Sequence, residues 1–239
     1  MLWVSTGFNP KQKKNWVVVG SQVVAGEVAI VPYGRGTHLA GIKLGGKGDV
    51  SDSHRLWTRT DSGCFVPTPS VDDGKVYVLR DRGEVHCIDP KTGKSHWEGA
   101  FPRASSSYYG SPTVAGGKLY APREDGVILV ADITDGFKFL AESDMGERVI
   151  ASPVPVANRL ALFHAVPTQN FGRPRTDFLS LLGVEVFDAD LPVAMTTLSA
   201  SLRQCSGNRP RCCSLLFCNA LLAFPVLCLW LPLLRGKIT

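Results

Sequence analysis

Two glycine-rich segments of this sequence have the residue types that could hold an anion. Residues 33–36 read Tyr-Gly-Arg-Gly, and residues 45–48 read Gly-Gly-Lys-Gly. Backbone N–H groups of successive glycines can bind phosphate or carboxylate oxygens, and the neighbouring Arg or Lys would add positive charge. The second segment lacks the spacing and the following Ser or Thr of a phosphate-binding loop. We interpret it as a loop insertion, and at residues 33–36 we favour a hairpin turn over an anion site.

The histidines, cysteines and acidic residues of the first 160 positions show no spacing that is typical of a metal site. The histidines are scattered at His38, His54, His86 and His96, and the two cysteines are Cys64 and Cys87. Zinc sites need ligands two to five residues apart. The acidic turns at residues 72–74 and 125–126 lack the ligand pattern of a calcium loop. The sequence therefore predicts no metal-binding residue and no catalytic residue.

The composition excludes several broad classes of protein. The 239 residues include 26 Lys and Arg against 21 Asp and Glu, and no basic stripe indicates a nucleic-acid partner. A hydrophobic fraction of 44% with 20% charged residues excludes a wholly disordered chain. The first residues are too short an apolar run for a secretory signal. Of the 24 glycines, 20 lie before residue 161, whereas five of the seven cysteines lie after residue 160.

The first part of the chain contains an internal repeat of about 40 residues. One set of anchors, spaced by 43 and 41 residues, is Pro69, Pro112 and Pro153. A second set, spaced by 40 and 43 residues, is Trp57, Trp97 and Leu140. Because two independent anchors share one period, we interpret the segment as successive copies of one structural unit.

Within each unit the pattern predicts strands. Residues 76–79 are an apolar, β-favouring run, and residues 84–88 alternate as a half-buried strand does. Residues 81–83 and 89–93 between them carry the Asp, Pro and Gly of turns. Residues 94–98 would form a fourth strand. Four short antiparallel strands in each 40-residue unit are typical of a β-propeller blade.

Residues 87–97 resemble the A-x-D-x-x-T-G-x-x-x-W motif of pyrroloquinoline quinone (PQQ) repeats. Asp89, Thr92, Gly93 and Trp97 match the motif, and Cys87 stands where alanine is usual. In that family the Trp packs between neighbouring blades, over a glycine of the next blade. The resemblance thus implies that the inter-blade residues are Trp57, Trp97, Gly74 and Gly117.

The resemblance implies an all-β fold, an incomplete β-propeller of about three to four PQQ-like repeats over residues 1–160. Leu2 and Trp3 are interpreted as the end of a preceding blade. Three blades cannot close a ring, and we expect the open blade edges to permit self-association. The superfamily includes quinoprotein alcohol dehydrogenases, a propeller lipoprotein of outer-membrane assembly and other bacterial envelope proteins, which implies the periplasm or cell envelope as the location.

The same resemblance raises PQQ and calcium as cofactors. Quinoprotein dehydrogenases use an Asp base, oxygen ligands for calcium and often a disulfide between adjacent cysteines. Cys212 and Cys213 are adjacent, but they lie outside every blade, and no acidic residue matches the base or the calcium ligands. We therefore expect that neither PQQ nor calcium is bound.

The loops that join the last strand of one blade to the first strand of the next gather on one face of a propeller. The second such loop carries Phe101, Arg103, Tyr108 and Tyr109. Aromatic residues with Arg are typical of protein-binding surfaces, so we predict these four as a partner-binding loop. Ordinary packing of the loop is the alternative.

Residues 161–239 differ in composition and are predicted to be an atypical tail. The tail contains a 20-residue run without charge that begins at Leu215 and ends at Leu234, long enough to span a membrane. Pro225 and Pro232 interrupt this run. Because the β pattern stops near Leu160, an out-of-frame or unselected tail is the interpretation we favour over a membrane span.

These observations favour a non-catalytic propeller module that acts as a protein-binding or scaffold unit in the bacterial envelope. A fragment of a PQQ-dependent alcohol dehydrogenase-like enzyme is the alternative. A propeller that binds sugar or peptidoglycan is not separated from the first interpretation by any residue pattern.

Overall fold

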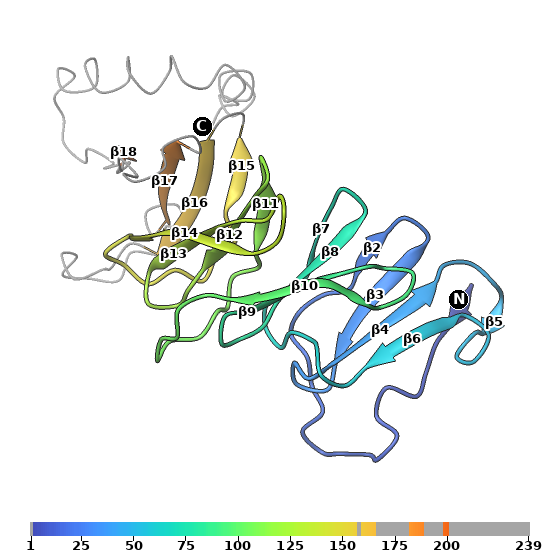
Figure 1. The fold of residues 1–239 in the computed structure, drawn as a ribbon. Helices are drawn as coiled ribbons and strands as arrows, with labels where there is room; N and C mark the ends of the chain where they lie inside the picture. Colours follow the sequence, from blue (N-terminus) through green and yellow to red (C-terminus); the bar gives the residue numbers. More distant parts are fainter. Residues whose placement is uncertain (1, 157–158, 166–181, 189–197, 201–239) are drawn as a thin grey trace, which may run out of the picture. The chain divides into compact units, whose positions relative to one another are not determined.

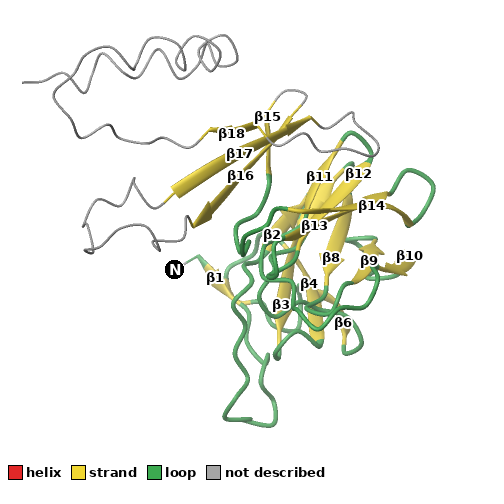
Figure 2. Ribbon diagram, turned by 90° about the vertical axis from the view of Figure 1, so that its left-hand side faces the viewer, coloured by secondary structure: helices red, strands yellow, loops and turns green. Residues whose placement is uncertain are grey.

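The computed structural model describes residues 2–156, 159–165, 182–188 and 198–200. Within them the chain forms strands and loops without a helix (Figure 2). Four four-stranded antiparallel sheets follow one another along the chain, each with its strands in sequence order (Figure 1). This arrangement confirms the predicted fold class, an incomplete β-propeller.

Each sheet is one blade. The first consists of β2 (Val23–Ala25), β3 (Val28–Tyr33), β4 (His38–Lys43) and β6 (Arg55–Arg59). The second consists of β7 (Ser70–Asp72), β8 (Lys75–Leu79), β9 (Glu84–Ile88) and β10 (Ser95–Ala100). The third consists of β11 (Thr113–Ala115), β12 (Lys118–Pro122), β13 (Val127–Asp132) and β14 (Lys138–Asp144). The fourth consists of β15 (Val154–Val156), β16 (Arg159–Ala165), β17 (Leu182–Asp188) and β18 (Leu198–Ala200).

The turn between β9 and β10 shows why the repeat motif keeps its polar residues. One carboxylate oxygen of Asp89 accepts hydrogen bonds from the backbone N–H of Lys91 at 3.0 Å and of Thr92 at 2.7 Å. The same oxygen accepts the Thr92 hydroxyl at 2.8 Å. Gly93 then adopts a φ of 71°, which a residue with a Cβ rarely does. The motif therefore builds a self-contained turn that returns the chain into the last strand.

Side chains alternate between the two faces of each blade and fill the spaces between blades. In β8, Val76 and Val78 pack in the cluster shared with Ile30 and Leu39 of the first blade. Tyr77, between them in sequence, packs in the cluster shared with the third blade. This period of two, with both faces buried, explains why β8 reads as a continuous apolar run.

A hydroxyl also links each blade to the next at the start of its first strand. The Ser21 N–H donates to the Thr68 hydroxyl at 3.0 Å. The Thr68 N–H donates to the Ser111 hydroxyl, and the Ser111 N–H donates to the Ser152 hydroxyl, both at 2.9 Å. Because one Ser or Thr side chain per blade satisfies the backbone of the blade before it, this link recurs with the repeat.

The N-terminal residues pair with the insertion of the first blade. Trp3 and Val4 form β1 (Trp3–Val4), which pairs in parallel with β5 (Gly48–Asp49). The insertion within the first blade, which we interpreted as a loop, therefore supplies the strand that β1 joins. The interpretation of Leu2 and Trp3 as the end of a preceding blade stays a prediction.

The structure places two strands, β17 and β18, after residue 160. The assignment of residues 161–239 to an atypical tail stays a prediction. The apolar run at residues 215–234 lies outside the described residues. In the part that is described, no helix has the length and apolar character to cross a membrane.

Candidate functional site

The predicted partner-binding loop divides into buried and exposed residues. Phe101 and Tyr108 are 2% and 1% exposed and belong to the core between the second and third blades. Their rings stack with centroids 6.1 Å apart. Arg103 and Tyr109 are exposed. Phe101 and Tyr108 are therefore core residues that anchor the loop, which agrees with the alternative of ordinary loop packing. Of the four predicted residues, Arg103 and Tyr109 are accessible to a partner.

Backbone hydrogen bonds hold this loop between two hairpins. The N–H groups of Phe101 and Tyr108 donate to the carbonyls of Gly83 and Asp81 in the second blade, each at 3.0 Å. The Ser107 carbonyl accepts the N–H of Glu124 in the third blade at 2.9 Å. Both ends of the loop are thus fixed while residues 102–105 remain exposed.

Trp57 is a wedge between the first and second blades. Its indole N–H donates to the Pro90 carbonyl at 2.8 Å, across the blade boundary. A Cβ built on Gly93 would lie 2.4 Å from Trp57 Cδ2, so the ring covers this glycine of the next blade. A large flat ring can approach the backbone this closely only where there is no side chain.

The glycines that we assigned to this role, Gly74 and Gly117, lie elsewhere. No atom is within 4 Å of a Cβ built on Gly74, and Gly117 faces the Thr134 hydroxyl. Both glycines have positive φ, 69° and 71°, in the first hairpin turn of their blades. These two glycines are therefore required by their turns. The glycine that the Trp57 ring covers is Gly93, which belongs to the repeat motif itself.

Trp97 is half-buried, and its environment differs from that of Trp57. Its ring lies 6.0 Å from the Tyr77 ring and 6.1 Å from the Phe137 ring. Phe137 of the third blade covers Gly99, since a Cβ there would lie 2.2 Å from the Phe137 Cγ. At this boundary the ring that covers a glycine therefore comes from the following blade, and Trp97 makes tilted ring contacts beside it.

A polar network that the sequence did not reveal joins the first and second blades. Arg59 binds Asp61 through two hydrogen bonds of 3.0 and 2.7 Å and reaches Glu98 at 3.3 Å. Glu98 also accepts the Ser95 hydroxyl at 2.7 Å. The Arg59 contact lowers the pKa of Asp61 to about 2. Because its members come from two blades, no local spacing could have indicated this network.

Buried Ser62 and His86 extend the network, but they do not form a catalytic triad. The Ser62 hydroxyl lies 2.9 Å from His86 Nδ1, and Glu98 lies 3.9 Å from the same nitrogen. A triad needs the nucleophile and the carboxylate on opposite ring nitrogens. Ser62 is also fully buried, so no substrate could reach it. The group is a structural contact between blades.

Acidification should destabilise the protein through His86. Burial is the main cause that lowers the pKa of His86, Arg59 and Arg80 lower it further, and Glu98 and Asp61 oppose them. The unfolded chain, with a normal histidine pKa near 6.5, therefore takes up a proton before the folded chain does. We expect the free energy of unfolding, measured in urea, to decrease as the pH falls from about 7.5 to about 5.5.

His86→Asn should reduce this slope, and the exposed His96→Asn should leave it intact. His38, whose pKa burial and Lys13 also lower, contributes a residual slope in the same direction. An unchanged slope in His86→Asn would contradict the assignment.

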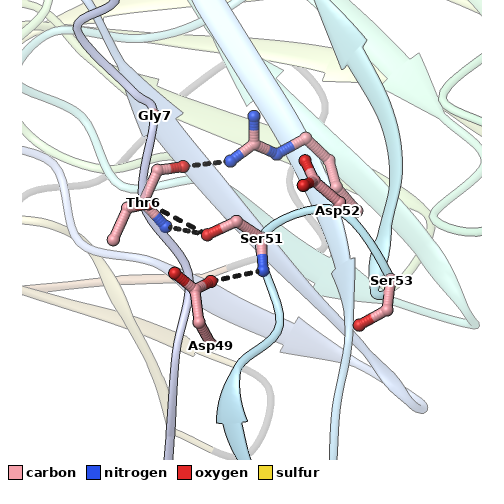
Figure 3. A pocket seen from close by; sticks show the side chains of 7 residues that line it. Thr6, Gly7, Asp49, Ser51, Asp52 and Ser53 are labelled. Carbon is pink, nitrogen blue, oxygen red and sulfur yellow. Dashed lines mark hydrogen bonds between the residues drawn. The ribbon is translucent and has the colours of Figure 1, made fainter.

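Arg55 lines two pockets, which we call hollows. The first, of about 480 Å³, is lined by Thr6, Asp49 and Ser51 among others (Figure 3). The Thr6 N–H donates to the Ser51 hydroxyl at 2.7 Å, and the Ser51 N–H donates to Asp49 at 2.9 Å. Arg55 donates to the Thr6 carbonyl. These contacts attach the N-terminal segment to the insertion of the first blade, so we interpret this hollow as structural.

The second hollow, of about 300 Å³, lies between residues 7–16 and the first blade. Its lining includes the aromatic rings of Trp16 and Tyr33 and the cations Lys11, Lys13 and Arg55. Residues 33–36 next to it form the turn between β3 and β4, as we favoured, with positive φ at Gly34, Arg35 and Gly36. Among the described residues no group of three His, Cys, Asp or Glu side chains could hold a metal.

Comparisons with known proteins agree with this architecture. Residues 46–139 match the family model of the outer membrane protein assembly factor BamB. No curated protein sequence matches the chain. The fold is similar to BamB from Moraxella catarrhalis, with 18% identity and a TM-score of 0.51 over 76% of this chain and 47% of that protein.

Two enzymes have a similar fold. Quinohemoprotein alcohol dehydrogenase from Comamonas testosteroni is 16% identical with a TM-score of 0.52 over 74% of this chain. The quinohemoprotein alcohol dehydrogenase ADHIIG from Pseudomonas putida HK5 is 16% identical with a TM-score of 0.55 over 80% of this chain. In both cases the match spans 34% of the enzyme. The likeness to the solved structures shows a propeller-type fold of four-stranded blades, and the match to the family model covers residues 46–139 of this chain.

Proposed function

We propose that the chain is part of a non-catalytic PQQ-like propeller that binds proteins as a scaffold in the bacterial periplasm or cell envelope. The observation that carries the proposal is the match of residues 46–139 to an outer membrane protein assembly factor. The chain spans about half of the BamB structure to which it is similar, so the function of the complete propeller is part of the proposal. Self-association through open blade edges stays a prediction.

The anchored loop between the second and third blades supports this function. Residues 102–105 and Tyr109 are exposed, while Phe101 and Tyr108 fix the loop from below. A loop that is held at both ends loses little conformational entropy when a partner binds. Arg103 and Tyr109 are residue types that are enriched at protein interfaces.

Photo-cross-linking in living bacteria tests the proposal. A benzophenone amino acid in place of Arg103 or Tyr109 should give specific adducts with envelope proteins that take part in outer-membrane assembly. The matched control is the same amino acid in place of Lys94, which is exposed in the turn before β10. Adducts with the same proteins in equal yield at all three positions would contradict the proposal.

The dehydrogenase alternative is tested on the purified chain. We propose that neither PQQ nor calcium binds, so their addition should leave the melting temperature unchanged and should support no dye reduction by an alcohol. A saturable rise in melting temperature together with dye reduction would favour the enzyme, because a ligand that binds the folded state stabilises it.

A further inference from the structure

We propose that the hollow between residues 7–16 and the first blade binds an acidic peptide segment of a protein partner. We name this hollow the basic pocket, and its lining residues used here are Lys11, Lys13, Trp16, Tyr33, His38 and Arg55. The inference rests on the proposed function, since it assigns part of the partner binding to a specific site and a specific chemistry.

The pocket residues of the first blade lie on the face that is opposite to the second blade, and the strand pairing explains why. Ile30 and Leu39 pack in the cluster shared with the second blade. Tyr33 and His38, which pair across β3 and β4, occupy the opposite face because side chains alternate along a strand. A register shift after Gly41 pairs Arg55 with Ile42 and brings Arg55 to this same face.

The N-terminal segment forms the opposite wall. The Trp16 ring covers Gly34, where a Cβ would lie 2.7 Å from the ring, and it contacts the His38 ring with centroids 4.8 Å apart. The Trp16 indole N–H donates to the Phe8 carbonyl, and the Phe8 ring lies 5.1 Å from the Tyr33 ring. The pocket is thus built by contacts between two segments and does not depend on one flexible loop.

Positive charge in the pocket is not neutralised. Its lining contains no Asp or Glu. In the described part of the chain no ion pair includes Lys11, Lys13 or Arg55. The Lys13 ammonium lies 4.7 Å above the Trp16 ring. A carboxylate would supply the missing negative charge.

The size of the pocket favours protruding side chains over a separate small molecule. At about 300 Å³ it lies at the lower limit of small-molecule sites. This volume suits one or two side chains, and the aromatic rings offer apolar surface to a residue beside a carboxylate. An acidic side chain flanked by an aromatic one therefore matches the pocket in both charge and surface.

The direct test is fluorescence anisotropy of the full chain with a labelled peptide Glu-Asp-Phe-Asp-Glu. We expect saturable binding that weakens with salt, because the charges are partly exposed. The matched peptide Gln-Asn-Phe-Asn-Gln should bind at least about tenfold more weakly. Lys13→Glu should reduce the affinity for the acidic peptide by a similar factor. Lys94 is exposed elsewhere, and Lys94→Glu should change that affinity by no more than about twofold.

Equal binding of the two peptides, or an unchanged affinity in Lys13→Glu, would overturn the inference. A preference for anionic lipid would also overturn the inference. In that case the chain would bind anionic vesicles more tightly than neutral ones, Lys13→Glu would abolish this binding, and the peptide would not bind. The cross-links at Arg103 and Tyr109 separate this inference from the proposed function. Their persistence without peptide binding would refute the basic pocket alone, whereas their loss together with intact peptide binding would refute the scaffold role of the loop alone.

Discussion

Replacement of Tyr108 by alanine is expected to reduce the free energy of unfolding by about 3–5 kcal/mol, as truncations of buried aromatic side chains do. Tyr108 is 1% exposed, and its ring packs on Phe101. A Cβ on Gly83 would lie 2.9 Å from the Tyr108 ring, which shows how closely the ring approaches that hairpin. Its removal would leave a cavity between the second and third blades. Urea unfolding followed by far-UV circular dichroism measures the effect.

The neighbouring Tyr109 provides the matched control. It is 38% exposed, and Tyr109→Ala should change the stability by no more than about 0.5 kcal/mol, as is usual at the surface. Tyr108→Phe should change the free energy of unfolding little, because the buried hydroxyl makes no hydrogen bond. Burial raises the pKa of this hydroxyl, and the nearby Arg123 opposes that rise. Equal losses in Tyr108→Ala and Tyr109→Ala would show that the loop is not anchored as described.

The blade architecture could be predicted because its causes are local and repeated. The apolar run of β8, the alternation of β9 and the Asp89 turn each specify their own structure within a few residues. The repeat then places the same structure in the next blade. A pattern that recurs in successive units is hard to misinterpret, and the bounds of β8, β9 and β10 agree with those predicted from the sequence to within two residues.

The candidate site could be predicted only in part because burial depends on neighbouring blades. Phe101 and Tyr109 are both aromatic residues of one loop, and nothing within the loop distinguishes the core ring from the exposed one. Likewise Arg59 meets Glu98 only when two blades pack together. The basic pocket escaped prediction because residues 7–16 have no counterpart in the repeat, so no period indicated what they cover.

Replacement of Trp57 by alanine is expected to cost about 3 kcal/mol of stability, near the lower limit for large aromatic truncations because the ring is half-buried. The substitution removes the ring from Gly93 and leaves the Pro90 carbonyl without the indole N–H. Trp57→Phe retains an aromatic ring and should recover part of the loss. Urea unfolding measures the stability of both variants. A loss below about 1 kcal/mol for Trp57→Ala is typical of a surface substitution and would contradict the role of Trp57 as a wedge between blades.

Two glycines with nearly the same backbone conformation show whether the ring itself is the cause. Gly74 and Gly93 have φ values of 69° and 71°, so alanine at either position should cost about 1–2 kcal/mol for its left-handed conformation. Gly74 has open space around it, whereas a Cβ on Gly93 would lie 2.4 Å from Trp57. Gly93→Ala should therefore cost about 1–3 kcal/mol more than Gly74→Ala, as over-packing does. In the Trp57→Ala background this excess should disappear, because the ring that the methyl group would meet is gone. An excess that survives there would mean that Gly93 is required by its turn alone, as Gly74 is, and that the Trp57 ring does not determine the glycine at this blade boundary.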